Sequence, residues 1–290
     1  MQEVVACISS LEDRKQLREI WKEAFGDEDA YLDLFFQHFG DCENIMVGKH
    51  GEEIVSMVFL LPVGTLCYPK VKEVQLFPVS MNYAFATKKR YQGNDYGSNL
   101  MRKAMEYNRN RGLTCNVLCP AEDEMFPLYE RKMGYQEFFY VKEAEDPPHI
   151  KEERAGNILL KRADAASYNQ VRETYLKTYS HVEYHESSLQ FQKQLCQMTD
   201  GDLFLLEEED WVGCACIERL PERLFIKELL LPERWTKAGL DKIYREFDMR
   251  KGIIRFPWFM GKSIEGTIRR FAVLNEKNIS GQGYLGFAFD

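Results

Sequence analysis

The stretch from Lys88 to Ser98, KKRYQGNDYGS, places glycines, cations and the expected start of a helix close together. Backbone N–H groups at the start of a helix point toward one spot at the positive end of the helix dipole, and such a spot binds phosphate. Two more cations, Arg102 and Lys103, follow within the helix, which suits a ligand with several phosphates. The alternative is plainer: a strand-to-helix turn uses glycine for its backbone freedom, and exposed lysines are usually just solvated.

Hydrophobic periodicity predicts the elements that precede this turn. Ser10 and Asp13 form a capping pattern ahead of a helix whose apolar face comprises Leu17, Ile20, Trp21, Ala24 and Phe25. A second helix is expected over Asp29–Phe39, because the apolar pattern continues and ends at a glycine. Apolar runs then predict three antiparallel strands, over Asn44–Val47, Ile54–Leu61 and Ser80–Thr87.

The elements after the turn alternate between helix and strand. A helix is expected after Gly97, with its buried face formed by Leu100, Met101, Ala104 and Met105. Three further elements complete the first half: a strand over Thr114–Leu118, a helix over Asp123–Lys132 and a strand over Tyr135–Val141.

This order of elements and two motifs resemble the GNAT superfamily of N-acetyltransferases. Ala86–Leu100 resembles the family's acetyl-CoA pyrophosphate signature, and Leu128–Tyr135 resembles its tyrosine-bearing segment. The resemblance covers residues 1–141. It implies an α+β fold with a mixed, mainly antiparallel sheet flanked by helices, and acetyl-CoA as the acyl donor. It assigns cofactor binding to seven residues of the turn, namely Gln92, Gly93, Asn94, Asp95, Tyr96, Gly97 and Ser98.

The resemblance also implies roles in the chemistry. The strand over residues 80–87 would splay from its neighbour and offer main-chain groups of Phe85, Ala86 and Thr87 to the pantetheine arm and the thioester. Tyr129 stands where the family's tyrosine protonates the departing thiolate. The alternative for Tyr129 is a buried structural tyrosine, because tyrosine also packs well where a helix meets a sheet.

One residue departs from the family pattern, and one role has no motif. The signature's first glycine falls on Asp95, so a carboxylate stands in a loop that should receive phosphates. A lysine-like amine, whose pKa is about 10.4, must lose a proton before it attacks the thioester. Tyr83, Glu43 and Glu73 are candidates to take that proton.

The second half repeats the order of the first. The expected elements are a strand over Asn157–Arg162, helices over Asp164–Ser180 and Ser187–Met198, a hairpin of Leu203–Leu206 with Trp211–Ile217, a strand over Arg223–Leu231 and a helix over Thr236–Asp248. Only Pro232–Trp235, without glycine, joins that last strand to its helix, so this copy cannot cradle a pyrophosphate in the same way.

The repeat predicts a catalytic domain over residues 1–145, a linker over 146–156 and a degenerate domain over 157–290. The linker contains Pro147-Pro148 and many charges. The second domain would shape the acceptor cleft, or serve as a packing partner or a homodimer surface. Val63–Val79 has no counterpart in the second half and would form a further wall of the cleft.

Composition excludes several classes of protein. Of the 290 residues, 45% are hydrophobic, which argues against a disordered chain, and the net charge of −8 argues against nucleic acid as a partner. Because no apolar run is long enough to span a membrane, we expect a soluble cytoplasmic protein without a membrane partner. No metal site is expected, because the cysteine pairs Cys115/Cys119 and Cys214/Cys216 miss zinc spacings and His181/His185 lacks a third ligand.

The sequence therefore predicts an acetyl-CoA-dependent N-acetyltransferase that modifies a primary amine, on a small molecule or a lysine side chain, by direct attack in a ternary complex. A second hypothesis is that the protein is a module that binds or senses acyl-CoA without turnover. The carboxylate of Asp95 in the turn motivates this hypothesis. A third is an acyltransferase with another donor, such as a longer acyl chain or an amino acid carried by tRNA.

Overall fold

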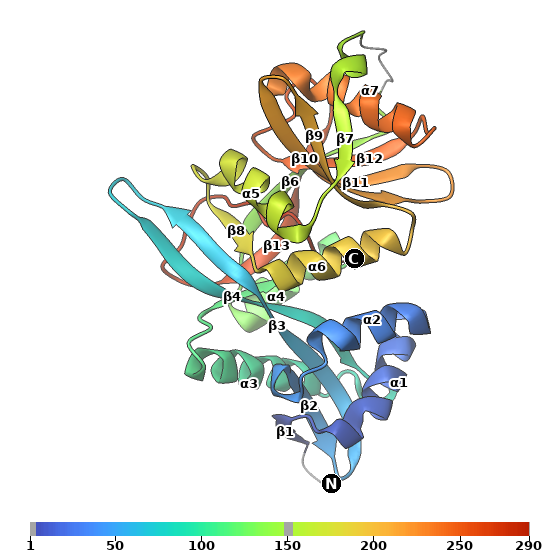
Figure 1. Ribbon diagram of the computed structural model, residues 1–290. Coiled ribbons are helices and arrows are strands. Elements are labelled where there is room, and N and C mark those ends of the chain that lie inside the picture. The colour runs from blue at the N-terminus through green and yellow to red at the C-terminus, as the bar shows by residue number, and fades with distance from the viewer. Residues whose placement is uncertain (1–3, 148–152, 290) are drawn as a thin grey trace. The chain divides into compact units, whose positions relative to one another are not determined.

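The structure is a computed structural model that describes residues 4–147 and 153–289. Its chain forms two compact units (Figure 1). Unit 1 comprises Met1–Thr65, Phe77–Glu137 and Ala272–Ser280, and unit 2 comprises Leu66–Leu76, Phe138–Phe271 and Gly281–Asp290. The part of the expected linker over residues 148–152 lies outside the described residues. Within the described residues, no helix is both long and apolar enough to cross a membrane.

Unit 1 is a sheet with helices on both faces. Its strand order is β1-β2-β3-β4-β5-β13, with β1 at Val5–Ile8, β2 at Ile45–His50, β3 at Glu53–Pro69, β4 at Val74–Thr87, β5 at Cys115–Leu118 and β13 at Thr267–Asn275. Its helices are α1 (Arg14–Phe25), α2 (Asp29–Phe39), α3 (Tyr96–Asn110) and α4 (Phe126–Met133). The pairs β1–β2 and β2–β3 are antiparallel and β4–β5 is parallel, which confirms the predicted α+β class.

The helices of unit 1 form where the apolar spacing predicts them. In α1 the residues Leu17, Ile20 and Trp21 are buried, and Gly26 ends the helix with a positive φ of 77°. In α4 a proline occupies the first turn, where its missing N–H costs nothing, and Gly134 ends the helix with a φ of 70°. These caps fix where each helix stops and where the next element begins.

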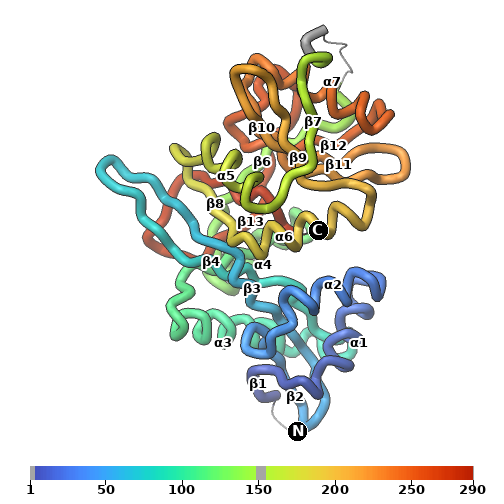
Figure 2. The backbone as a smooth tube through the Cα atoms, in the orientation of Figure 1, coloured from blue at the N-terminus to red at the C-terminus, as the bar shows by residue number. Residues whose placement is uncertain are grey.

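The segment Val63–Val79 forms the outer part of the β3–β4 hairpin. It continues β3 and β4 outward as one long two-stranded ribbon, which the tube in Figure 2 shows. Alternating exposure at the start of β4 indicates a strand that packs on few neighbours there, with Val74 and Leu76 among the exposed apolar residues.

The sheet of unit 1 includes a strand from near the end of the chain. In β13, Val273 pairs with Leu118 and Asn275 pairs with Asn116, so β13 lies antiparallel against β5. Asn275 also donates to the carbonyls of Met133 and Gly134 at 3.2 and 2.8 Å. Unit 1 is thus built from both halves of the sequence. The division into domains 1–145 and 157–290 stays a prediction, because compact units and sequence repeats need not share boundaries.

Unit 2 has a sheet and helices of its own. Its strand order is β6-β12-β11-β10-β9-β7, with β6 at Gln136–Glu145, β7 at Leu159–Arg162, β9 at Asp202–Glu208, β10 at Trp211–Arg219, β11 at Leu224–Leu230 and β12 at Gly252–Pro257. Its helices are α5 (Ala165–Leu176), α6 (Glu186–Gln197) and α7 (Thr236–Glu246). The helix predicted to reach Ser180 stops at Leu176, and the short strand β8 (His181–Tyr184) follows it.

Candidate active site

The strand β4 extends several residues beyond its pairing with β5. Their parallel pairing comprises Val79 with Cys115, Ser80 with Asn116 and Met81 with Val117. The strand β5 ends at Leu118, whereas β4 continues to Thr87. The backbone of β4 from Asn82 onward therefore runs beside no continuation of β5. In a parallel sheet, ligands bind beyond such carboxyl ends, where a backbone edge is left for them.

A bulge at Ala84 redirects the side chains of this free segment. The φ of Ala84 is +45°, a value that ordinary residues rarely adopt in a strand. Asn82 contacts Met101 of α3, and Phe85 contacts Gly97 of the same helix. In a regular strand, residues 82 and 84 would face α3. Residues 82 and 85 face it instead, so the bulge inserts one extra residue into the alternation of side chains. Tyr83 lies on the other side, against Trp21 and Phe35.

The turn after β4 is exposed and leads directly into α3. Gln92, Gly93, Asn94 and Asp95 are exposed, whereas Tyr96, Gly97 and Ser98 in the first turn of α3 are partly covered. The Gln92 side chain donates to the Thr87 carbonyl at 3.0 Å, which ties the turn to the end of β4. Asp95 makes no capping hydrogen bond to α3, so its side chain does not consume the N–H groups at the start of the helix.

Gly93 and Gly97 serve different purposes. Gly93 has a φ of +80° with open space where a side chain would begin, so the backbone conformation requires glycine. Gly97 has no positive φ. A Cβ there would lie 2.9 Å from Thr87 Oγ1 and 3.0 Å from the Phe85 ring, so this glycine lets α3 approach β4 closely. The close approach holds the helix start beside the free end of the strand.

Asp95 occupies a left-handed backbone position. Its φ of 57° and ψ of 11° suit glycine best, and aspartate is one of the few other residues that tolerate them. Its side chain is exposed. The departure from the family pattern therefore leaves the shape of the turn intact and adds one negative charge beside the helix start.

Glu53 holds two cations of the turn, Lys88 and Arg90, and no local sequence pattern predicts this contact. Its carboxylate accepts hydrogen bonds from Lys88 at 2.7 Å, from Tyr91 at 2.9 Å and from Arg90. The hydrogen bond from Lys88, with further help from Arg90 and Tyr91, lowers the pKa of Glu53 to about 2. The loop is thereby fixed to the start of β3, and one negative charge faces two of its cations.

Tyr129 lies on α4 within the core of unit 1. It is buried, and burial raises the pKa of its hydroxyl to about 12, so the hydroxyl keeps its proton at neutral pH. Its ring meets that of Tyr135 edge to face, with centroids 6.1 Å apart. Phe85 packs against the same cluster of buried residues, which includes Leu100 and Met101. The fold therefore brings the end of β4, α3 and α4 together around Tyr129.

The three candidate bases lie in different surroundings. The Tyr83 hydroxyl lies 2.6 Å from that of Tyr31, and the Tyr83 ring stacks on Phe35 with centroids 5.4 Å apart. Glu43 is exposed and lies 3.6 Å from Arg111. Glu73 follows the turn of the β3–β4 ribbon in unit 2, where its carbonyl accepts from the Lys70 N–H. Only Tyr83 stands on the free segment of β4.

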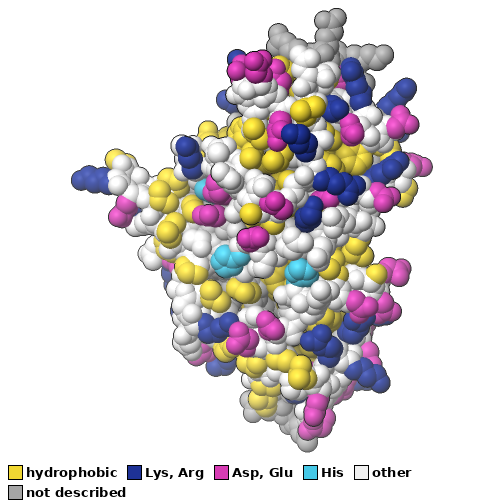
Figure 3. All heavy atoms as spheres, in the orientation of Figure 1, with side chains coloured by type: hydrophobic (Ala, Val, Ile, Leu, Met, Phe, Trp, Pro, Cys, Tyr) yellow, Lys and Arg dark blue, Asp and Glu magenta, His cyan; other side chains and the backbone are white. Residues whose placement is uncertain are grey.

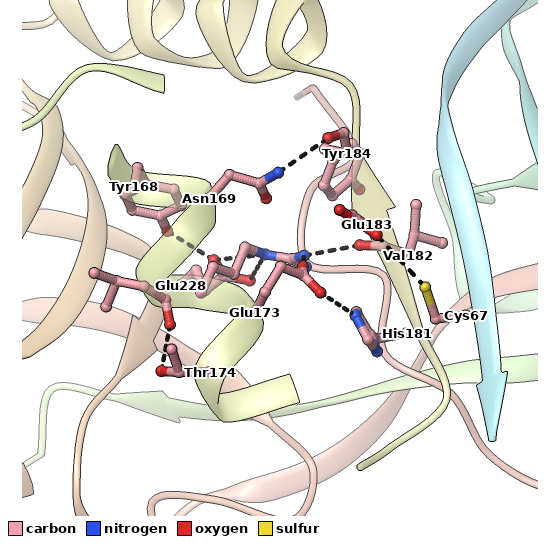
Figure 4. Close-up of polar contacts among 12 residues, drawn as sticks. Cys67, Tyr168, Asn169, Glu173, Thr174, His181, Val182, Glu183, Tyr184 and Glu228 are labelled. Carbon is pink, nitrogen blue, oxygen red and sulfur yellow. Dashed lines mark hydrogen bonds and ion pairs between the residues drawn. The ribbon is translucent and has the colours of Figure 1, made fainter. Parts of the chain in front are cut away.

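In unit 2 the equivalent place is filled by a buried ion pair. The strand β11 pairs in parallel with β12 up to Ile226, and Glu228 stands two residues beyond, as Tyr83 stands two beyond Met81. Glu228 accepts from Arg172 Nε at 3.1 Å and from the Tyr168 hydroxyl at 2.7 Å (Figure 4). Glu228 and Arg172 are both fully buried.

The start of α7 also differs from the start of α3. Trp235 immediately precedes α7 and is buried against Trp211, with ring centroids 5.4 Å apart. The chain before α7 thus carries a buried Trp235 indole, whereas the turn before α3 in unit 1 is exposed. The described residues contain no group of three His, Cys, Asp or Glu side chains that could hold a metal ion.

Comparison with known proteins identifies the fold. Residues 9–138 match the family model of the acetyltransferase (GNAT) domain. A GCN5-related N-acetyltransferase from Kribbella flavida is 15% identical with a TM-score of 0.73, over 94% of this chain and 70% of that one. A GCN5-related N-acetyltransferase from Anabaena variabilis is 16% identical with a TM-score of 0.71, over 94% and 72%.

A putative acetyltransferase from Pyrococcus horikoshii is 12% identical with a TM-score of 0.60, over 96% of this chain and 91% of that one. No curated protein sequence matches the chain. At these identities the solved structures show a shared fold.

Proposed function

Since residues 9–138 of this chain are a GNAT acetyltransferase domain, and the protein is thus an acyltransferase, we propose that it transfers an acetyl group from acetyl-CoA to a primary amine. One observation carries the proposal: the free end of β4 lies beside an exposed glycine turn at the uncapped start of α3. The first feature supplies backbone donors for an extended arm, and the second supplies N–H groups for phosphates.

These two features support a position for the donor. Its pyrophosphate would lie at the turn Gln92–Ser98, and its pantetheine arm would run along the free segment of β4 to a thioester near Phe85, Ala86 and Thr87. A backbone N–H of this segment would stabilise the negative charge that forms on the thioester oxygen during attack.

The reaction forms one bond and breaks one. The amine nitrogen bonds to the thioester carbon, the carbon–sulfur bond breaks, and the thiolate takes the proton of Tyr129. A cationic amine loses two protons in all. The first would leave before attack, by way of Tyr83 to solvent, and the second, released as the amide forms, would pass through water and restore the Tyr129 hydroxyl. Because burial holds the pKa of Tyr129 at about 12, that hydroxyl is protonated at the start of every cycle near neutral pH.

The acceptor is proposed to be cationic before it reacts. A net charge of −8 attracts amines, polyamines and lysine side chains at long range. On the face shown in Figure 3, acidic and basic side chains are interspersed, so this attraction is diffuse and does not choose among them.

A calorimetric titration with acetyl-CoA tests the donor site. Ser98→Glu places a carboxylate in the first turn of α3, where the helix dipole favours it, so the melting temperature should stay the same or rise. The same carboxylate repels phosphate, so the dissociation constant should rise at least tenfold. Ser98→Gln has the same length without the charge and is the matched control. Equal affinity for Ser98→Glu and Ser98→Gln would reject a pyrophosphate site at this turn.

Product formation separates transfer from binding alone. The protein is incubated with acetyl-CoA and a panel of primary amines, and free thiol release is followed. Tight binding with no thiol release across the panel would favour the acyl-CoA-sensing module. Release only with longer acyl donors would favour a different acyltransferase.

A further inference from the structure

Asn82 is the first residue of β4 beyond its pairing with β5. Its side chain is buried, at 4% exposure. The amide nitrogen donates to the Tyr135 hydroxyl at 2.7 Å and lies 3.0 Å from the Met101 sulfur. The amide oxygen, Oδ1, has no hydrogen-bond partner among the residues that the structure describes. A buried carbonyl oxygen without a partner costs folding free energy, so its hydrogen-bonding capacity calls for an explanation, which a water molecule or a ligand can supply.

The position of this oxygen points to a particular ligand. The Asn82 side chain lies on the α3 side of β4, where the strand has left β5. Its amide nitrogen contacts Tyr135, whose ring packs against Tyr129. A donor bound as proposed would follow this segment of β4, on a path from the turn at the start of α3 to Tyr129. The pantetheine arm is the part of the donor that spans this path, and it carries two amide N–H groups.

We propose that Asn82 Oδ1 accepts a hydrogen bond from an amide N–H of the pantetheine arm of the acyl donor. This inference rests on the proposed function, because it assumes a CoA donor in unit 1. Asn82 is a binding residue for the arm and a positioning residue for Tyr129, which it reaches through Tyr135.

Two probes isolate the arm from the phosphates. Coenzyme A carries the arm, and 3′-phospho-ADP is the same nucleotide without it. Asn82→Leu is expected to weaken coenzyme A binding by tenfold or more and to leave 3′-phospho-ADP binding within twofold of the unchanged protein. Titration calorimetry gives both dissociation constants, and thermal unfolding reports on the fold. Asn82→Thr, whose β-branched side chain suits a strand and is too short to reach, serves if the leucine variant is insoluble.

Asn108 offers a matched control. It is also buried, also has an unpartnered Oδ1, and lies on α3. Its amide donates to Ser80 and Asn116, in the stretch where β4 and β5 still pair. Asn108→Leu should change the two dissociation constants by the same factor, because it touches no part of the arm's path.

The outcomes separate the two proposals. Loss of coenzyme A affinity alone in Asn82→Leu supports the inference. Equal loss for both probes, or no loss, overturns it while the donor site stands. Failure of the unchanged protein to bind either probe overturns the proposed function and the inference together.

Discussion

The Lys88 ammonium donates to the Glu53 carboxylate at 2.7 Å and so joins the beginning of the turn before α3 to the beginning of β3. The partners of Glu53 lower its pKa from 4.5 to about 2. A carboxyl whose pKa is lower in the folded state stabilises the fold above its unfolded pKa, and this stabilisation disappears as the pH falls from about 4.5 to about 2.

Glu53→Gln should lower the free energy of unfolding by roughly 1 kcal/mol at pH 7, a modest value because the ion pairs are partly exposed. The difference from the unchanged protein should shrink as the pH falls below about 4.5. Urea unfolding at a series of pH values measures it. Glu52→Gln, at an exposed neighbour, is the control, and a difference for Glu53→Gln that grows toward acid pH would contradict the assignment.

Asp95→Gly should tighten acetyl-CoA binding by about 3- to 10-fold at low salt, because it removes one negative charge beside the proposed phosphates. It should also stabilise the protein slightly, since glycine prefers the φ of 57°. Asp95→Asn separates the two effects, because it removes the charge and keeps a side chain. If acetyl-CoA binds more weakly to either variant, the Asp95 carboxylate does not face the phosphates.

Tyr129→Phe should lower kcat by about 100-fold and change the acetyl-CoA dissociation constant by less than threefold, because only the proposed proton donor is lost. Since its pKa is about 12, Tyr129 should cause no loss of rate below about pH 10. Tyr107→Phe, at a hydroxyl that donates to the Glu43 carbonyl on the surface of unit 1, is the control. An alkaline decline below pH 10 that vanishes in Tyr129→Phe would refute this account.

Gly286→Ala should destabilise unit 2 by about 2–4 kcal/mol. A Cβ there would lie 2.8 Å from Glu228 Oε1 and 3.0 Å from an Arg172 nitrogen, inside the buried ion pair, and the φ is +92°. Gly281→Ala has a similar φ of +97° with nothing within 4 Å of the added atom, so it should cost only about 1 kcal/mol. Chemical unfolding compares the two, and equal losses would show that backbone strain alone matters.

Much of the fold of unit 1 follows from the sequence because its signals are local. Apolar residues three and four apart predict α1 and α2, and glycines mark where α1 and α4 end. The glycine turn and the tyrosine segment are also contiguous motifs. Local spacing predicts these elements because helix periodicity and turn chemistry depend on neighbouring residues.

Other features depend on residues that are distant in the chain. The placement of β13 beside β5 joins residues about 155 positions apart, the Glu53 carboxylate meets Lys88 across 35 positions, and Asn82 meets Tyr135 across 53. The bulge at Ala84 and the strand β8 likewise left no periodic signal. Local sequence patterns alone predict the helices, the glycine turn before α3 and the resemblance that the GNAT domain match over residues 9–138 bears out. The strand that completes the sheet of unit 1 and the buried groups around Tyr129 become visible only in the folded protein, because backbone pairing and side-chain burial are set by packing between distant segments.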